Sequence, residues 1–143
     1  MRISDVLRHK GPQVATLPPS ASVSELIAAL ADHNIGAMVV LDADTVVGIV
    51  SERDVVRQLK DRGADLLAAP VSEIMTTSVF TCAVEDTVDG LGHTMTERRI
   101  RHVPVLTDGR LVGIVSIGDV VKTRIDELET DRQQLEAYIT QAR

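Results

Sequence analysis

Short apolar runs alternate with polar breaks along the chain, and their spacing predicts strands and helices in a fixed order. Residues 37–41 and 46–50 are β-rich runs around a polar turn, which indicates a hairpin. Apolar residues recur at close to a 3.6 period after Ser22, which predicts a helix with Ser22 at its N-cap. A short β segment is expected at 14–16, and a second helix begins at Ser51. The predicted order is therefore βαββα.

The same pattern occurs a second time. Gly48 corresponds to Gly113, an offset of 65 residues, and residues 35–56 match residues 100–121 at 11 of 22 positions without gaps. The second copy has a short β segment at 79–81, a helix beginning at Thr87, β runs at 102–106 and 111–115 around Asp108-Gly109, and a helix beginning at Ser116. An Asp-Gly pair between two β runs is typical of a hairpin. The chain is therefore a tandem duplication of one unit.

The predicted strands are short and apolar on both faces, so they require cover by helices on both sides. One unit of this size buries little surface alone. We therefore expect an α/β (α+β) fold in which the two units stack face to face, share a core and form a cleft with pseudo-two-fold symmetry. The segment 61–70 connects them and is expected to be partly helical.

The composition excludes several classes of function. The chain has 143 residues, 44% hydrophobic and 25% charged, as in an ordinary globular domain. Phe80 and Tyr138 are its only aromatic residues, so it lacks the stacking platforms of single-strand nucleic-acid binders. A net charge of −6 also argues against binding nucleic acid. The single cysteine, Cys82, excludes an internal disulfide and fits a reducing cytoplasm, and no segment approaches membrane-spanning length.

Each copy contains Gly-hydrophobic-x-Ser-x-x-Asp after an apolar strand, at residues 48–54 and 113–119. This repeated motif, together with Val103-Pro104-Val105, resembles the CBS-domain pair, also called a Bateman module. The resemblance covers about residues 3–125. It implies CBS repeat 1 at 1–62, a linker at 63–70, CBS repeat 2 at 71–125 and a C-terminal helical extension at 126–143. It also implies a cytoplasmic regulatory module that binds AMP, ATP, NAD or a related adenosine ligand in the cleft.

The residues of the Ser-x-x-Asp elements have two interpretations. Ser51 and Ser116 precede a helix, and Asp54 and Asp119 follow three residues later, which fits helix capping. A helix N-terminus also attracts phosphate. In the family, the Asp accepts hydrogen bonds from the ribose hydroxyls and the Ser meets phosphate or ribose. Because a carboxylate can accept two hydrogen bonds at once, it suits a vicinal diol, and we expect at least one Asp to bind ribose.

The adenine base is expected between aliphatic residues near the strand starts. In the first copy the candidates are Val14, Thr16, Ile35, Gly36, Ala37 and Met38. In the second copy they are Val79, Thr81, Ile100, Arg101, His102, Val103 and Pro104. The alternative is that these are core strands, an interpretation at least as good for Val14, Val79 and Ile100.

The two copies differ in charge. Arg101 and His102 replace Gly36 and Ala37 of the first copy. Related CBS pairs use basic residues near here on nucleotide phosphates, so we expect Arg101 or His102 to contact a phosphate. Arg53, which only the first copy has, is a further candidate. A solvated basic patch is the alternative. These differences predict two related but unequal pockets.

No catalytic constellation is found along the sequence. There is no Walker-type phosphate loop and no Gly-x-Gly-x-x-Gly, and the four histidines lack metal-ligand spacing. We therefore expect no enzyme activity, no metal and no required cofactor. The alternative to a nucleotide sensor is a ligand-independent dimeric interaction or stress protein in which the Ser-x-x-Asp elements only cap helices.

The last helix is predicted to continue past the second repeat. Apolar positions follow 4-3 spacing, interrupted by one arginine: Val121, Ile125, Leu128, Arg132, Leu135, Ile139 and Ala142. Such a seam pairs with the same helix of a second subunit or packs back on the domain. We expect a homodimer to which this helix contributes, acting on a target protein in trans.

Overall fold

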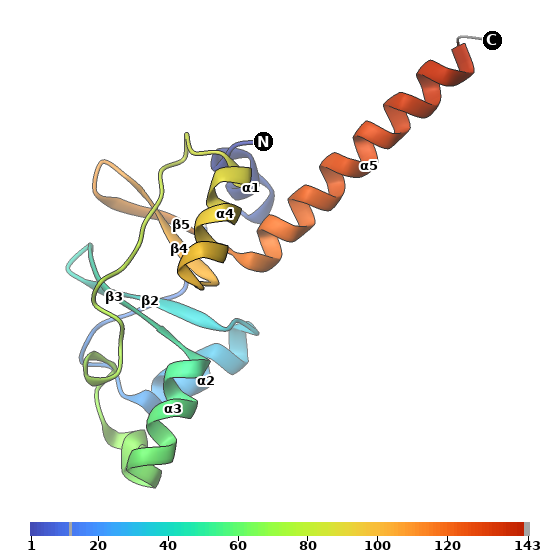
Figure 1. Cartoon of the computed structure of the whole chain (residues 1–143). Helices are drawn as coiled ribbons and strands as arrows, with labels where there is room; N and C mark the ends of the chain where they lie inside the picture. The colour runs from blue at the N-terminus through green and yellow to red at the C-terminus, as the bar shows by residue number, and fades with distance from the viewer. Residues whose placement is uncertain (12, 142–143) are drawn as a thin grey trace.

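Both repeats form the helices and the hairpin that the hydrophobic pattern predicts (Figure 1). The computed structural model describes residues 1–11 and 13–141. Its elements are α1 (Ile3–Lys10), β1 (Thr16–Leu17), α2 (Val23–His33), β2 (Ala37–Asp42), β3 (Thr45–Ser51), α3 (Glu52–Arg62), the 3-10 helices η1 (Gly63–Ala68) and η2 (Val71–Glu73), α4 (Val88–Arg98), β4 (His102–Thr107), β5 (Arg110–Ser116) and α5 (Ile117–Gln141). The Ser22 hydroxyl accepts a hydrogen bond from the Glu25 N–H at 3.1 Å, and Thr87 accepts one from Gly90 at 3.0 Å, so both predicted N-caps are confirmed.

The two hairpins have the same register. Val39 pairs with Ile49 in the β2–β3 ladder, and Pro104 pairs with Ile114 in the β4–β5 ladder, at positions related by the repeat offset. Both ladders also have a register shift one residue further along. The duplication therefore extends to the irregularities of the strands.

The short β segment at the start of each repeat lies later than predicted. The expected positions are 14–16 and 79–81. Strand β1 is Thr16–Leu17, parallel to β2. In the second repeat the equivalent pairing with β4 is a single bridge between Cys82 and Val105, and no strand forms over 79–81.

A proline explains why the segment around Cys82 pairs with β4 at one position only, whereas β1 pairs with β2 at two. In the first repeat Thr16 pairs with Val39. Pro104 stands at the equivalent position and has no N–H to donate to a ladder. The N–H of Cys82 still donates to the Pro104 carbonyl at 3.0 Å, and the Cys82 carbonyl accepts from Leu106 at 2.9 Å. The pairing therefore stops at Cys82.

Each repeat packs around its own hydrophobic core, which corrects the expectation of one shared core. One cluster of buried residues comes from α2, β2, β3 and α3, and the other from α4, β4, β5 and α5. Each hairpin is covered mainly by the helices of its own repeat, so the chain has two cores and not a single shared one. The repeats meet along β3 and β5, between α2 and α3 on one side and α1 and α4 on the other (Figure 1).

Each core includes a segment that lies outside its own repeat in the sequence. Helix α1 precedes the first repeat in the sequence, but its Ile3 is fully buried in the core of the second. Leu66, Val71 and Ile74 are buried in the core of the first repeat. The linker at 61–70 is partly helical, as predicted, through η1. Neither repeat therefore contains its complete core as one continuous stretch of sequence.

The glycines of the two motifs accommodate these segments. A Cβ on Gly48 would lie 2.5 Å from the sulfur of Met75, and one on Gly113 would lie 2.5 Å from Cδ2 of Leu7. Both glycines are in the interior of a strand, where the role of glycine is a close approach by another segment. A side chain at either motif glycine would therefore require Met75 or Leu7 to shift.

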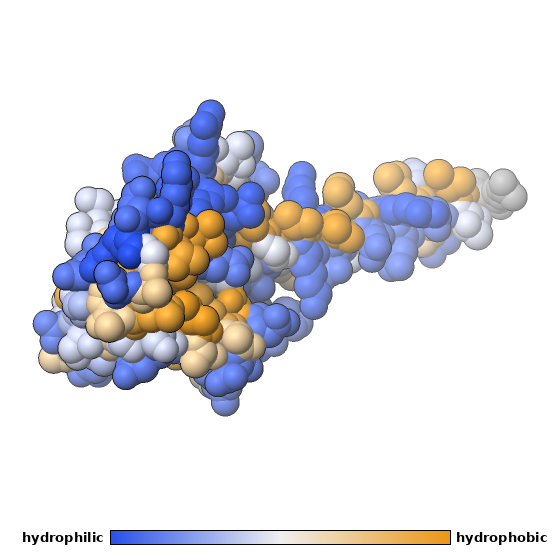
Figure 2. Space-filling model, turned by 90° about the horizontal axis from the view of Figure 1, so that it is seen from below, coloured by the Kyte–Doolittle hydropathy of each residue, from blue (hydrophilic) through white to orange (hydrophobic). Residues whose placement is uncertain are grey.

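Helix α5 continues far beyond the second repeat, as predicted (Figure 1). Leu128, Leu135 and Ile139 are 53%, 62% and 57% exposed, so the seam does not pack back on the domain. Figure 2 shows apolar atoms continuing along this arm. Ala142 of the predicted seam lies outside the described residues. Among the helices that the structure describes, none has the length and apolarity needed to cross a membrane.

Candidate functional site

Both Ser-x-x-Asp elements form capping boxes. The Ser51 N–H donates to Oδ2 of Asp54 at 2.8 Å, and the Asp54 N–H donates to Oγ of Ser51 at 3.3 Å. The equivalent distances for Ser116 and Asp119 are 2.9 and 3.2 Å. The capping interpretation is therefore confirmed for both copies.

Each Ser-x-x-Asp element faces the other repeat. Ser51 and Asp54 line one wall of a cavity of about 500 Å³, which we call the Asp54 pocket. The facing wall comes from the second repeat, from residues 78–80 and from residues 98–102 at the start of β4. The carboxylate of one repeat thus lies in the same pocket as the strand start of its duplicate.

A second cavity, of about 640 Å³, occupies the equivalent place on the other side, and we call it the Ser116 pocket. Ser116 lines it together with residues 13–15 and 33–37 of the first repeat. Through the repeat offset these segments correspond to 78–80 and 98–102 of the Asp54 pocket. The predicted cleft is therefore two pockets related by the pseudo-two-fold axis.

Arginines distinguish the Asp54 pocket. It is lined by Arg53, Arg98, Arg99 and Arg101. The positions equivalent to these hold Gly118, His33, Asn34 and Gly36. The guanidinium of Arg98 lies over the ring of Phe80, 4.6 Å from its centroid, which is a cation–π contact at the pocket wall.

The candidate phosphate residues of both copies line one pocket. Arg53 comes from the first copy, and Arg101 and His102 come from the second. The structure places all three around the Asp54 pocket, because each Ser-x-x-Asp element faces the strand start of the other repeat. The arginines therefore line the Asp54 pocket, whereas the basic residues of the Ser116 pocket are Lys10, His33 and the shared His102.

A lysine from α1 engages the carboxylate of the second copy. Nζ of Lys10 lies 2.8 Å from Oδ2 of Asp119 and 2.8 Å from the Ile114 carbonyl oxygen. Partial burial raises the pKa of Asp119, but the hydrogen bonds and charge of Lys10 and the hydrogen bonds of Ser116 outweigh it, so the pKa lies below its ordinary value. Within residues 1–11 and 13–141, Asp54 hydrogen-bonds only to Ser51, through Oδ2, and its Oδ1 has no donor.

His102 separates the two pockets. It lines both of them, as does Gly36, and a Cβ on Gly36 would lie 3.5 Å from Cε1 of His102. Burial lowers the pKa of His102, and the charge of Lys10 adds to this, while Asp119 and Glu52 oppose it. The imidazole is therefore neutral at neutral pH and gains a proton only in acid.

The structure brings most of the predicted site residues to the two pockets. The Asp54 pocket is lined by Gly36, Ala37, Ser51, Arg53, Asp54, Val79, Ile100, Arg101 and His102, and the Ser116 pocket by Val14, Ile35, Gly36, Ala37, His102 and Ser116. Six predicted residues line neither: Thr16, Met38, Thr81, Val103, Pro104 and Asp119. Met38, Val103 and Pro104 are buried within the strands, so the core-strand alternative describes their packing.

Sequence reasoning missed Lys10, Glu52 and Phe80. Phe80 had a signal, because it adjoins Val79 and is one of two aromatic residues in the chain. Glu52 had one too, as a residue within the first Ser-x-x-Asp element. Lys10 had none, since its position depends on α1 crossing to the second repeat.

The linings of the two pockets combine polar and apolar side chains, which suits the binding of a small molecule. No group of three or more metal-ligating side chains occurs in the part of the chain that the structure describes. Burial, together with the charge of Asp86, raises the pKa of Cys82 to about 12, so it remains a thiol. An open carboxylate beside several guanidinium groups can hold a diol and an anion at the same time.

Comparison with known proteins identifies relatives of the whole module. The CBS domain family model matches residues 3–61 and 71–126. The chain is 34% identical over 146 residues to the CBS domain-containing protein CBSX3, mitochondrial, of Arabidopsis thaliana, which covers 96% of this chain and 71% of that protein. It is 31% identical over 108 residues to CBS domain-containing protein YhcV of Bacillus subtilis, covering 76% of each.

Solved structures have the same fold. The CBS-domain containing protein ATU1752 from Agrobacterium tumefaciens superposes with a TM-score of 0.84 at 46% identity, covering 87% of this chain and 99% of that one. The CBS domain pair of protein MJ0100, in complex with 5′-methylthioadenosine and S-adenosyl-L-methionine, superposes with a TM-score of 0.78 at 27% identity, covering 89% and 98%.

Proposed function

We propose that this chain, which belongs to the CBS-domain family, is a regulatory module that binds an adenosine-containing ligand in the Asp54 pocket. The observation that carries the proposal is the combination, in one pocket, of arginines and the Asp54 carboxylate, which forms no ion pair with any described residue. The complex of the MJ0100 domain pair with two adenosine compounds supports this class of ligand.

Asp54 is proposed to bind the ribose. Its Oδ2 already accepts hydrogen bonds from the N–H and the hydroxyl of Ser51, at 2.8 and 3.1 Å, so the carboxylate is held in one orientation. Its Oδ1 remains for the ribose hydroxyls. The base then lies against Val79 and Ile100, which are half-buried in the facing wall.

The arginines favour a ligand with a negative charge. Arg53 and Arg101 are exposed and belong to opposite walls of the pocket, so both are placed to contact a phosphate. AMP, ATP and NAD carry such groups. S-adenosyl-L-methionine carries a sulfonium cation, which the same arginines repel. We therefore expect phosphorylated adenosine ligands to bind more tightly than the sulfur-containing ones.

Binding is proposed to act by changing geometry. Because the walls of the Asp54 pocket come from different repeats, a bound ligand stabilises one relative placement of the repeats over others. We infer a sensor without catalytic activity or a required cofactor. It acts in the cytoplasm as a homodimer on a target protein in trans, and binds neither nucleic acid nor membrane.

The alternative proposal is a ligand-independent dimeric interaction protein. The observation that favours it is that both capping boxes are complete without any ligand, so the Ser-x-x-Asp elements already have a structural role. In that case the pockets are a by-product of packing two duplicated units.

Calorimetric titration of the full chain with adenosine, AMP, ATP, NAD, 5′-methylthioadenosine and S-adenosyl-L-methionine separates the two proposals. We expect binding of at least one phosphorylated ligand with one site per chain. Guanosine monophosphate serves as the control for the base. If none of the adenosine compounds binds at millimolar concentration, the ligand-independent alternative stands.

A further inference from the structure

Helix α5 carries an apolar stripe that the rest of the chain leaves uncovered. The stripe consists of five residues, each 50–62% exposed: Val121, Ile125, Leu128, Leu135 and Ile139. Their 4-3 spacing places them on one face of the helix, with Arg132 in the middle. The stripe begins in a groove of about 370 Å³ between α4 and α5 and runs along the arm (Figure 2).

This arm lacks the packing that normally stabilises a helix. Every residue from 128 to 141 is exposed. Helices of about 12–15 residues are marginal in water on their own, and in proteins their stability comes mostly from packing an apolar face. One ion pair within the arm, Arg132 to Glu136 at 3.1 Å, contributes little at so exposed a site. We therefore expect the stripe to pack against another helix or surface.

We propose that the partner is α5 of a second copy, aligned antiparallel with the two-fold axis at residue 130. This register places the stripe positions opposite one another in three pairs, each formed twice: 121 with 139, 125 with 135, and 128 with 132. The two-fold axis thus places every stripe residue of one copy against a stripe position of the other. An interface formed by the same surface on both subunits has this property.

The arginine within the stripe favours the antiparallel direction. In a parallel pair, Arg132 would lie against Arg132 of the partner subunit inside the apolar seam, where two like charges lose solvent. In the antiparallel register, Arg132 lies against the partner's Leu128. Its aliphatic stem then packs on the leucine while the guanidinium reaches solvent at the edge.

Charges beside the stripe are balanced between the two directions, so the direction rests on Arg132. The antiparallel register brings Lys122 next to Glu136 of the partner subunit, twice by symmetry. A parallel pair would instead bring Glu136 next to the partner's Asp131, which places like charges together. The antiparallel register also places Glu129 beside Glu129 of the partner subunit and Asp131 beside the partner's Asp131, whereas a parallel pair would place Arg124 beside the partner's Glu129.

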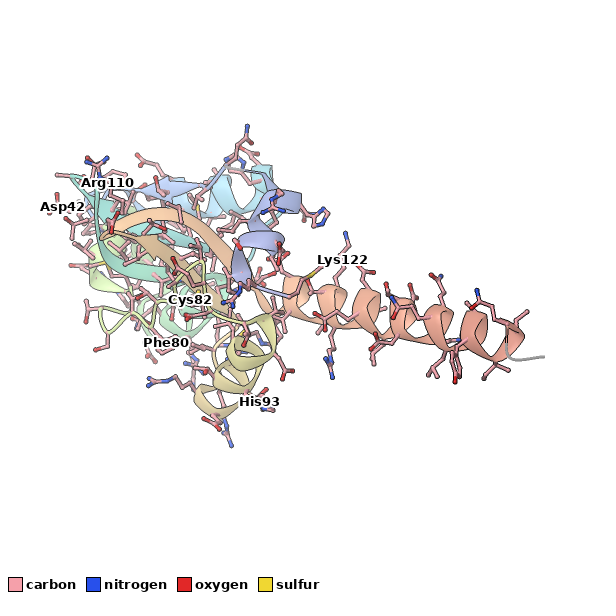
Figure 3. The ribbon with its side chains drawn as sticks, turned by 90° about the horizontal axis from the view of Figure 1, so that it is seen from above. Asp42, Phe80, Cys82, His93, Arg110 and Lys122 are labelled. Atoms are coloured by element: carbon pink, nitrogen blue, oxygen red, sulfur yellow. The ribbon has the colours of Figure 1, made fainter. Side chains whose placement is uncertain are left out.

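The α4–α5 groove receives the end of the partner's helix in this register. Val88 and Gly92 of α4 and Val121 of α5 line it, and Ile139 of the partner subunit arrives opposite Val121. Figure 3 shows Lys122 where α5 leaves the body, with His93 on α4. Each arm therefore spans from its own repeat to the groove of the other copy.

Cysteine crosslinking of the full chain tests the register. The double variant Val121→Cys/Ile139→Cys should give disulfide-linked dimers under mild oxidation, because these positions lie opposite across the axis. The single variant Leu135→Cys should give none, although it would crosslink in a parallel pair. Native Cys82 is buried with its pKa raised to about 12, so the unmodified chain is a non-crosslinking control. Crosslinking of Leu135→Cys, or the absence of crosslinking in the double variant, overturns the proposal.

A charge swap tests the pairing without new cysteines. Lys122→Glu should raise the dimer dissociation constant about fivefold, since two exposed ion pairs become repulsive, and Lys122→Glu/Glu136→Lys should restore it. Lys60→Glu on α3 is the matched control and should change nothing. Sedimentation equilibrium measures all four chains. Failure of the double variant to recover dimerisation rejects the Lys122–Glu136 contact and with it the register.

Discussion

The two Ser-x-x-Asp elements, one beside the Asp54 pocket and one beside the Ser116 pocket, have the same duplicated backbone and differ most in what surrounds their carboxylates. Asp119 forms an ion pair with Lys10 at 2.8 Å, whereas the carboxylate of Asp54 accepts hydrogen bonds, among the described residues, only from Ser51. The arginines that line the Asp54 pocket have uncharged or weakly basic counterparts in the other. Duplication has therefore preserved the capping geometry of both carboxylates. A side chain from outside the motif, Lys10, decides which of the two is available to a ligand.

Removing the available carboxylate should have the largest effect. Asp54→Ala should weaken binding of the ligand found by calorimetry about 10- to 100-fold, because a charge-assisted pair of hydrogen bonds to ribose is lost. Asp119→Ala is the matched control, since it removes the same capping group from the equivalent helix. The ligand affinity of Asp119→Ala should stay within about twofold of that of the unmodified chain. Equal losses in the two variants would mean that the carboxylates act through helix stability and not through contact with the ligand.

Removing the lysine should make the two pockets more alike. In Lys10→Ala, Asp119 loses its cation, so calorimetry should detect a second, weaker adenosine site in addition to the first. The second site should prefer adenosine to AMP, because the arginines have no counterparts there. Lys60→Ala, an exposed lysine of α3, should leave one site per chain.

The same variant should change the titration of Asp119. Its pKa is held below the ordinary value chiefly by Lys10, against the opposing effect of burial. Without the lysine, burial remains and the pKa should rise, which an NMR pH titration of the carboxyl carbon measures. An unchanged pKa together with a single site would show that Lys10 does not close this pocket.

Replacing an arginine of the Asp54 pocket should weaken the binding of phosphorylated ligands and leave adenosine binding nearly unchanged. Arg101→Ala should weaken AMP about tenfold through the loss of a charge-assisted hydrogen bond and leave adenosine within about twofold. Arg110→Ala, at the tip of the β4–β5 hairpin (Figure 3), is the control for overall charge. Unchanged AMP affinity in Arg101→Ala would remove this residue from the proposed phosphate contact.

The smallest effect should come from pH. The pKa of His102 lies below its ordinary value of about 6.5, so the group is neutral at pH 7. A phosphate beside it favours the protonated form, so AMP binding should take up protons and strengthen a few-fold as the pH falls below about 6.5. His102→Gln should lose this increase and retain only the dependence that arises from the phosphate itself. If AMP affinity rises equally at low pH in the unmodified chain and in His102→Gln, the pH dependence does not come from His102.

The sequence was sufficient to predict the order of elements, the helix N-caps and the grouping of most site residues into two pockets. These features depend on local patterns and on the repeat, which a single sequence contains. The pairing of the walls was not predictable in the same way. Whether Arg53 and Arg101 share a pocket depends on how the two repeats face each other, and neither residue carries that information.

The role of Lys10 and the displaced β segment have other causes. Lys10 reaches Asp119 only because α1 packs on the second repeat, a contact between distant parts of the chain. The missing strand at 79–81 follows from Pro104, whose lack of an N–H is visible in the sequence. It becomes informative only once the strand partner is known.

The segments that each core takes from outside its own repeat give the chain an order of assembly. As the protein is synthesised, the first repeat can close its core once Ile74 has emerged, whereas Ile3 must wait for β4, β5 and α4. The docking of α1 closes a loop of most of the chain, so it is expected to be among the slowest contacts. Until that contact forms, Lys10 is away from Asp119, and a newly made chain presents two open carboxylates where the finished one presents a single one.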